Sequence, residues 1–104
     1  MKIWIDDERQ APPGYVHKHS VNAAQAYIRY CEKKQDRFPE FRIELIDIDH
    51  DAGAFAQRGG DYIRILDWLE ATGRSYPIRI HSMNPVGAEN MRRIIRRNGW
   101  MEVH

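Results

Sequence analysis

The chain has 104 residues, 42% hydrophobic and 30% charged, and this length and composition predict a single globular domain over residues 1–104. Its 16 Lys and Arg residues nearly balance 15 Asp and Glu residues, which excludes a bulk charge that attracts nucleic acid or a membrane. The one cysteine excludes an internal disulfide. Without a long apolar run or a signal-peptide pattern, the sequence predicts a cytoplasmic protein with no membrane partner.

The first half of the chain predicts three strands and one helix. Residues 2–5 are short and apolar and predict a strand, which is followed by a Pro-Pro-Gly loop at 12–14. Residues 15–19 predict a second strand. A helix over 20–34 is indicated by the N-cap Ser20 and by apolar residues at three- and four-residue spacing. Residues 42–48 predict the central strand.

The second half predicts two helices and two further strands. Asp61 can cap a helix that ends at Gly73, and residues 77–81 predict a strand. Asn84 followed by Pro85 is typical of a helix start, and this helix ends near Gly99, before a last short strand at 100–103. Strands that alternate with helices predict an α/β protein, with about five mostly parallel strands in a sheet covered by helices on both faces.

Three of the predicted strands end in polar residues. Right-handed crossovers place the loops after residues 5, 48 and 81 at the same edge of the sheet, so these residues should converge. In chain order they are Asp6, Asp7, Glu8, Arg9, Asp49, His50, Asp51, His81, Ser82 and Asn84.

The carboxylates predict a metal site. Asp6, Asp7 and Asp49, with Asp51, form an oxygen-rich set that suits a hard divalent cation, with Mg²⁺ or Mn²⁺ as the expected cofactor. Strand alternation puts Asp47 on the same side as Asp49, which leaves open whether Asp47 joins the site. The alternative is that Asp6 and its neighbours form a solvated turn.

The two histidines suit proton transfer. His50 and His81 lie beside carboxylates, where an imidazole can serve as a general acid or base, and Asp49 lies between their strand ends as a further catalytic candidate. The alternatives are a loop histidine bonded to a neighbour for His50 and a core histidine for His81.

A phosphate site is predicted at the start of the last helix. Ser82 offers a hydroxyl, and the free amides after Asn84, those of Val86 and Gly87, form an anion site at a helix N-terminus. Arg9 can add two hydrogen bonds to a phosphate. The alternative for Asn84 is a capping role alone.

The later part of this helix carries four arginines, which are read as a solvated face rather than an extended nucleic-acid surface. They are Arg92, Arg93, Arg96 and Arg97. Arg96 and Arg97 lie near the helix C-terminus, where cations complement the helix dipole.

Several stretches carry a resemblance to a known family: Asp6-Asp7-Glu8-Arg9, Ala11-Pro12-Pro13-Gly14-Tyr15, Asp49-His50-Asp51-Ala52-Gly53 and His81-Ser82-Met83-Asn84-Pro85-Val86-Gly87-Ala88-Glu89-Asn90-Met91. They resemble the cyclic-phosphate processing receiver domains, which are grouped by fold with response-regulator receivers. The resemblance implies a flavodoxin-like sheet in which the loop replaces the first crossover helix. It also implies processing of cyclic phosphates in RNA repair or nucleotide signalling.

Compared with an ordinary receiver, Asp6 and Asp7 match the metal-binding pair, Asp49 the phosphate-accepting aspartate and Ser82 the hydroxyl residue. The lysine that pairs with the phosphoryl group in receivers has no counterpart, because the last lysine of this chain is Lys34. Phosphorelay signalling is therefore the least favoured interpretation.

Three functions stay open. The leading hypothesis is a metal-assisted phosphoesterase acting on the cyclic phosphate of a nucleotide or an RNA end. The second is a non-catalytic module that binds a cyclic nucleotide and needs Arg9 and the helix N-terminus but not the histidines. The third is a divergent receiver-type signalling domain.

Overall fold

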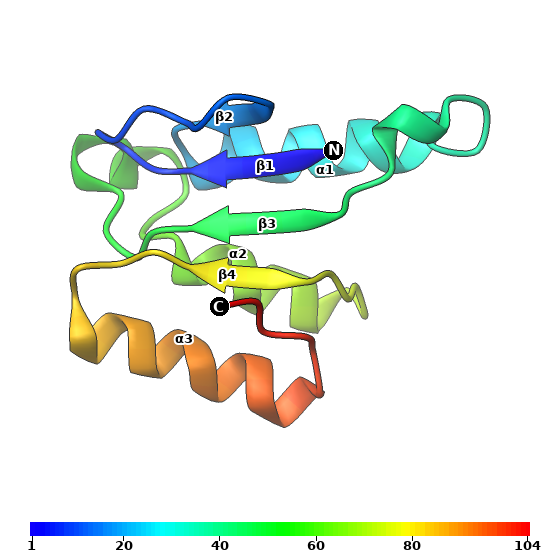
Figure 1. The fold of residues 1–104 in the computed structure, drawn as a ribbon. Coiled ribbons are helices and arrows are strands. Elements are labelled where there is room, and N and C mark those ends of the chain that lie inside the picture. Colours follow the sequence, from blue (N-terminus) through cyan, green and yellow to red (C-terminus); the bar gives the residue numbers. More distant parts are fainter.

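The computed structural model covers residues 1–104 and contains four strands and three α-helices (Figure 1). The strands, in the sheet order β2-β1-β3-β4, are all parallel to their neighbours. The elements are β1 (Lys2–Ile5), β2 (Tyr15–Lys18), α1 (Val21–Lys34), η1 (Pro39–Phe41), β3 (Leu45–Ile48), η2 (Gly53–Arg58), α2 (Ile63–Ala71), β4 (Ile78–Ile80) and α3 (Pro85–Asn98). The predicted α/β class and parallel sheet are confirmed.

Local sequence accounts for the ends of α1 and α3. The Ser20 side chain accepts a hydrogen bond from the amide of Ala23, which caps α1. The Asn84 side chain accepts one from the amide of Gly87, which caps α3. The predicted cap of α2 is wrong, because the Asp61 carboxylate instead accepts from the amide of Ala52, 3.1 Å away. No helix has both the length and the apolar character needed to cross a membrane.

The predicted fifth strand at 100–103 is wrong. This segment makes one isolated parallel bridge, between Ile78 and Glu102, and no continuous strand. β4 is three residues long, so its free edge offers the C-terminal segment little backbone to pair with.

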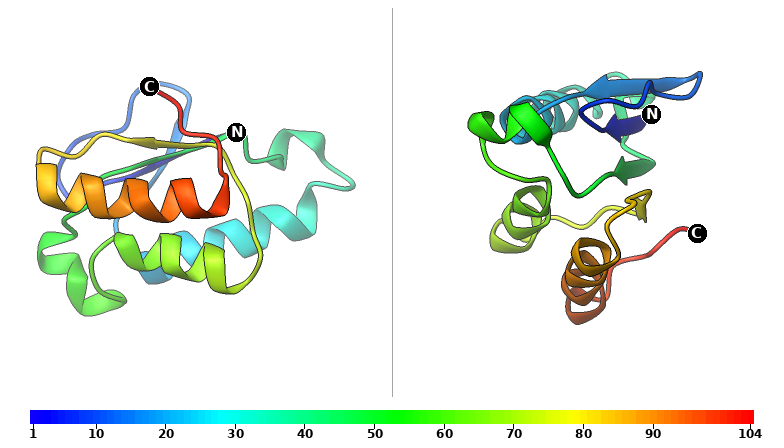
Figure 2. Two further views of the ribbon diagram at one scale, coloured as in Figure 1. Left: turned by 90° about the horizontal axis from the view of Figure 1, so that it is seen from below. Right: turned by 90° about the vertical axis from the view of Figure 1, so that its left-hand side faces the viewer.

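The three helices all lie on one face of the sheet, so the predicted three-layer arrangement is wrong (Figure 2). The reason is topological. Each of the three helical connections leads across the sheet in the direction from β2 towards β4, and right-handed crossovers then put every helix on the same face. Only the connection from β1 to β2 runs the other way, and its residues 6–14 contain no helix.

The strand side chains divide accordingly. Residues at alternate positions point towards the helices and belong to one buried aliphatic cluster with them, and in the strands these are Ile3, Ile5, Ile46, Ile48 and Ile78. The residues between them point to the other face, where Trp4, Asp47 and Arg79 are paired across three adjacent strands. The core therefore lies between the sheet and the helices.

Candidate functional site

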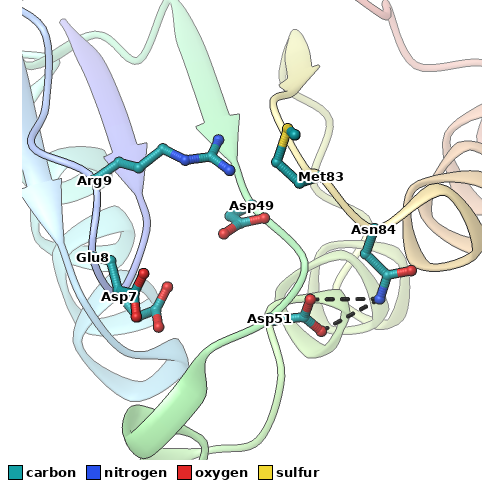
Figure 3. Close-up of a pocket in the computed structure, with 7 residues that line it drawn as sticks. All are labelled: Asp7, Glu8, Arg9, Asp49, Asp51, Met83 and Asn84. Atoms are coloured by element: carbon teal, nitrogen blue, oxygen red, sulfur yellow. Dashed lines mark hydrogen bonds between the residues drawn. The ribbon is translucent and has the colours of Figure 1, made fainter.

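The carboxyl ends of the strands meet at one edge of the sheet, and a pocket of ≈ 290 Å³ opens there (Figure 3). The connection that leaves the carboxyl end of β1 runs to β2, whereas the one that leaves β3 runs to β4. The two diverge between these neighbouring strands, and open α/β sheets bind ligands at such a point. Four carboxylates and one guanidinium dominate the lining, which consists of Asp7, Glu8, Arg9, Asp49, Asp51, Met83 and Asn84.

Three carboxylates converge at the ends of β1 and β3. Asp6, Asp7 and Asp49 each offer an oxygen atom within 4.8 Å of the others, and Asp6 and Asp49 are buried. Burial raises the pKa of Asp7, and the neighbouring carboxylates add to the rise. This uncompensated negative charge and the all-oxygen donor set fit a hard divalent cation. Asp6, Asp7 and Asp49 could therefore hold a metal ion, and its binding there stays a prediction.

Asp6 is held in one orientation by three donors. One carboxylate oxygen accepts from the amides of Glu8 and Arg9, both at 2.9 Å, and the other lies 2.8 Å from His81 Nε2. Burial alone would raise the pKa of Asp6, but these hydrogen bonds outweigh it and hold the pKa below its ordinary value. Asp6 is therefore a fixed, ionised carboxylate.

His81 lies between two buried carboxylates on the helix-free face. Its Nδ1 is 2.6 Å from Asp47 Oδ1, its Nε2 contacts Asp6, and its ring stacks on Trp4 with ring centroids 3.8 Å apart. Both ring nitrogens are thus engaged within the protein. The second oxygen of Asp47 is buried without a hydrogen-bond partner, and Arg79 Nη1 lies 3.8 Å from it. Asp47 therefore acts on the site indirectly. It orients His81, and His81 in turn orients Asp6.

His50 and Asp51 form a second pair, of which only Asp51 lines the pocket. His50 Nδ1 lies 2.8 Å from Asp51 Oδ1, and the Asn84 amide lies 3.5 Å from both oxygens of Asp51 (Figure 3). The His50 ring packs on Gly87 so closely that a Cβ there would lie 2.5 Å from Cγ of the ring. Gly87 therefore makes room for an imidazole, and Asp51 lies outside the carboxylate trio.

The predicted phosphate donors are only partly brought together. The backbone amide of Gly87 donates to the Asn84 side chain that caps α3, so it is not free to bind a phosphate. The backbone amide of Asn84 donates to Ser82 Oγ at 3.0 Å. Val86 is exposed at the start of α3 and does not line the pocket. Arg9 does line it, and its Nη1 donates to the carbonyl of His81 at 2.8 Å, which holds the guanidinium over the carboxylates.

Neither His50 nor His81 lines the pocket, so their acid–base role stays a prediction. Two features of the site were not predicted from the sequence. One is the stack of Trp4 on His81, although strand alternation from Trp4 to Asp6 points to a shared face. The other is Met83, the single apolar residue of the lining.

Three of the four arginines of α3 are ion-paired. Arg92 pairs with Glu102 and Arg96 with Glu89, each at 3.0 Å, and a further pair joins α3 to α2. That pair is Arg97 with Glu70, at 2.7 Å. These partners occupy guanidinium groups that a nucleic-acid surface would need free.

Comparison with known proteins identifies one family. A family model described as "Cyclic-phosphate processing Receiver domain" matches residues 1–97, which include every residue of the pocket. No curated protein and no solved structure matches the chain.

Proposed function

The chain belongs to the cyclic-phosphate processing receiver domain family, and we propose that it is a metal-assisted phosphoesterase that opens cyclic phosphates of nucleotides or RNA ends. The observation that carries the proposal is the convergence of Asp6, Asp7 and Asp49 beside Arg9. Three carboxylate oxygens and one guanidinium at a single edge of the sheet suit a phosphate ester bound together with Mg²⁺ or Mn²⁺. In the reaction, water adds its hydroxyl to phosphorus, one P–O ester bond breaks, and the leaving oxygen receives a proton.

The three carboxylates would hold the metal. A divalent cation at this position supplies Lewis acidity, which polarises a phosphoryl oxygen and favours ionisation of water. Asp7 and Asp49 face the pocket directly, whereas Asp6 is buried behind them.

Arg9 would hold the phosphate. Its guanidinium is anchored by the carbonyl of His81 and retains further N–H groups that can donate to phosphoryl oxygens. It provides the positive charge that an ordinary receiver takes from a lysine, which this chain lacks beyond Lys34. Ser82 does not line the pocket, and its hydroxyl accepts from the backbone amide of Asn84.

The pair of His50 and Asp51 is the candidate for proton transfer. Asp51 lines the pocket and, if it accepts the Nδ1 proton of His50, leaves Nε2 as the basic nitrogen. His81 has both nitrogens engaged, and we assign it the task of orienting Asp6.

The proposal is tested by incubating the protein with Mg²⁺ or Mn²⁺ and either 2′,3′-cyclic nucleotides or RNA ending in a cyclic phosphate. We expect turnover. Loss of an outer-shell partner of a metal typically reduces activity by about 10–100-fold, and Asp49→Asn should reduce turnover by more than this, because Asp49 is a proposed direct ligand. Asp67→Asn, an exposed aspartate on α2, is the matched control and should leave turnover unchanged. If the folded protein shows no turnover with any metal, the proposed phosphoesterase activity is contradicted.

A non-catalytic module is the second candidate, because neither histidine lines the pocket. The two candidates differ in their response to His50→Ala. An enzyme should lose turnover while keeping affinity for the cyclic nucleotide, whereas a binding module has no turnover to lose and keeps its affinity.

A further inference from the structure

Two exposed apolar side chains border the charged pocket. Met83 is 82% exposed and Val86 is 73% exposed, more than any other large hydrophobic residue of the chain. They lie on either side of the Asn84 cap of α3, and Met83 is itself part of the pocket wall (Figure 3). We call Met83 and Val86 the apolar lip. Single exposed apolar residues are ordinary, but a pair at the rim of a polar pocket is typical of a ligand contact.

A second hollow of ≈ 280 Å³ opens beyond this lip. Its lining begins where that of the first pocket ends along the chain, and it consists of Pro85, Val86, Glu89, Asn90 and Arg93. Spacings of three and four residues put these side chains on one face of α3. Asn90 is exposed, and its Oδ1 accepts a hydrogen bond from Arg93 Nη1 at 3.3 Å, while its side-chain NH₂ can donate to a ligand.

We propose that the apolar lip is the subsite for the nucleobase of the ligand whose phosphate is held by the charged pocket. This inference rests on the proposed function and adds to it a subsite that recognises the base, which a base-free cyclic phosphate lacks. A base has apolar faces and polar edges. The Met83 thioether makes favourable contacts with an aromatic ring, and Val86 extends the same apolar surface towards the amide of Asn90.

The charged pocket cannot supply this contact by itself. Apart from Met83, every residue that lines it is charged or carries an amide, so it offers a base no other apolar surface. The lip and the second hollow continue from the pocket along the same loop and helix start, so a ligand with its phosphate at Arg9 can extend over them.

The test compares two cyclic esters, with Mn²⁺ present: a 2′,3′-cyclic nucleotide and glycerol 1,2-cyclic phosphate, which has no base. In the double variant Met83→Ser with Val86→Ser, kcat/KM for the nucleotide should fall about 5–10-fold, while that for the glycerol ester should not change. Met101→Ser is the matched control, since Met101 is 65% exposed on the C-terminal segment, and it should affect neither probe. Equal losses with both probes, or a wild type that shows no preference for the nucleotide, would overturn the subsite.

A binding measurement separates this inference from the phosphoesterase itself. On titration with a nucleoside 3′-monophosphate and Mg²⁺, the ring current of the base should shift the methyl ¹³C signal of Met83 and leave that of Met101 unmoved. A shift of the Met83 signal without turnover of any ester would support the base subsite and contradict the phosphoesterase activity. Turnover without a shift of the Met83 signal would support the phosphoesterase activity and contradict the base subsite.

Discussion

The two faces of the sheet are built from different chemistry. The face towards the helices carries aliphatic side chains such as Ile46, which is fully buried in the main core cluster. The opposite face, at the neighbouring residue of the same strand, carries Asp47, which is 1% exposed. One strand thus provides a core residue and a buried charge side by side.

This difference assigns the faces separate tasks. Burial of apolar area stabilises the fold on the helical face. On the helix-free face, Trp4 and Asp47 hold His81, and His81 holds Asp6 at the edge of the pocket. Substitutions on the first face should therefore affect stability, and those on the second should affect the metal site.

The largest expected effect comes from the helical face. Ile46→Ala removes a fully buried side chain, and large-to-small changes of this kind destabilise by about 2–5 kcal/mol. Chemical denaturation measures the loss. The affinity for Mn²⁺ of the protein that remains folded should not change, and a large drop in that affinity would break the separation of the two faces.

Asp47→Ala tests the helix-free face. Without Asp47 the ring of His81 loses one of its two hydrogen-bond partners and orients Asp6 less well. Loss of a direct partner of a metal ligand typically costs about 10–100-fold in metal affinity, and because Asp47 lies one contact beyond that partner, we expect a loss at the lower end of this range. Asp47→Asn should retain most of the affinity, because its amide oxygen still accepts from Nδ1. Asp67→Ala, at an exposed aspartate of α2 that has no contact with His81, is the control. If all three variants bind Mn²⁺ equally well, Asp47 has no positioning role.

Gly87→Ala tests the packing of His50. The new Cβ would lie 2.5 Å from the ring, and overpacking of this kind costs about 1–3 kcal/mol. In a His50→Ala background the clash is absent, and the same change should instead stabilise α3 by up to about 1 kcal/mol through helix propensity. A double-mutant cycle by thermal denaturation gives the coupling, and identical effects in the two backgrounds would refute the contact.

The smallest effect is expected from Asp7→Asn. Because the pKa of Asp7 is raised in the fold, the metal-free protein loses stability as pH rises from the ordinary value of 3.8 through the raised pKa. The variant should therefore be more stable than the wild type above this range, by about 0.2–1 kcal/mol, while binding Mn²⁺ more weakly. Denaturation at several pH values measures the difference in stability between the variant and the wild type, with Asp67→Asn as the control. A destabilised variant would show that Asp7 is not repelled by its neighbours.

Much of this architecture is local and was therefore predictable. Ser20 and Asn84 cap their helices through contacts within three residues, and each carboxylate of the trio follows a buried strand. The single helical layer was also implied, since the Pro-Pro-Gly loop occupies the one connection that could have placed a helix on the other face. Applying the crossover rule to each connection would have corrected the three-layer prediction.

The roles of the histidines depend on contacts between distant segments. The sequence predicts that the amide of Gly87 binds a phosphate, but this amide donates to the Asn84 cap, and the ring of His50 packs on Gly87 from another loop. His81 was predicted to be free for catalysis, yet it contacts Asp6 and Asp47 across three strands. Residue type and spacing indicate which groups gather at the edge, but not which group turns towards which.

The central claim, that the carboxylate trio binds a divalent cation, is tested most directly by paramagnetic broadening of amide NMR signals with Mn²⁺. Substoichiometric Mn²⁺ should selectively broaden the signals of Asp7, Asp49 and their chain neighbours, and Asp49→Asn should abolish the effect. Broadening centred on another acidic region, such as Asp36, or no selective broadening at all, would contradict the claim.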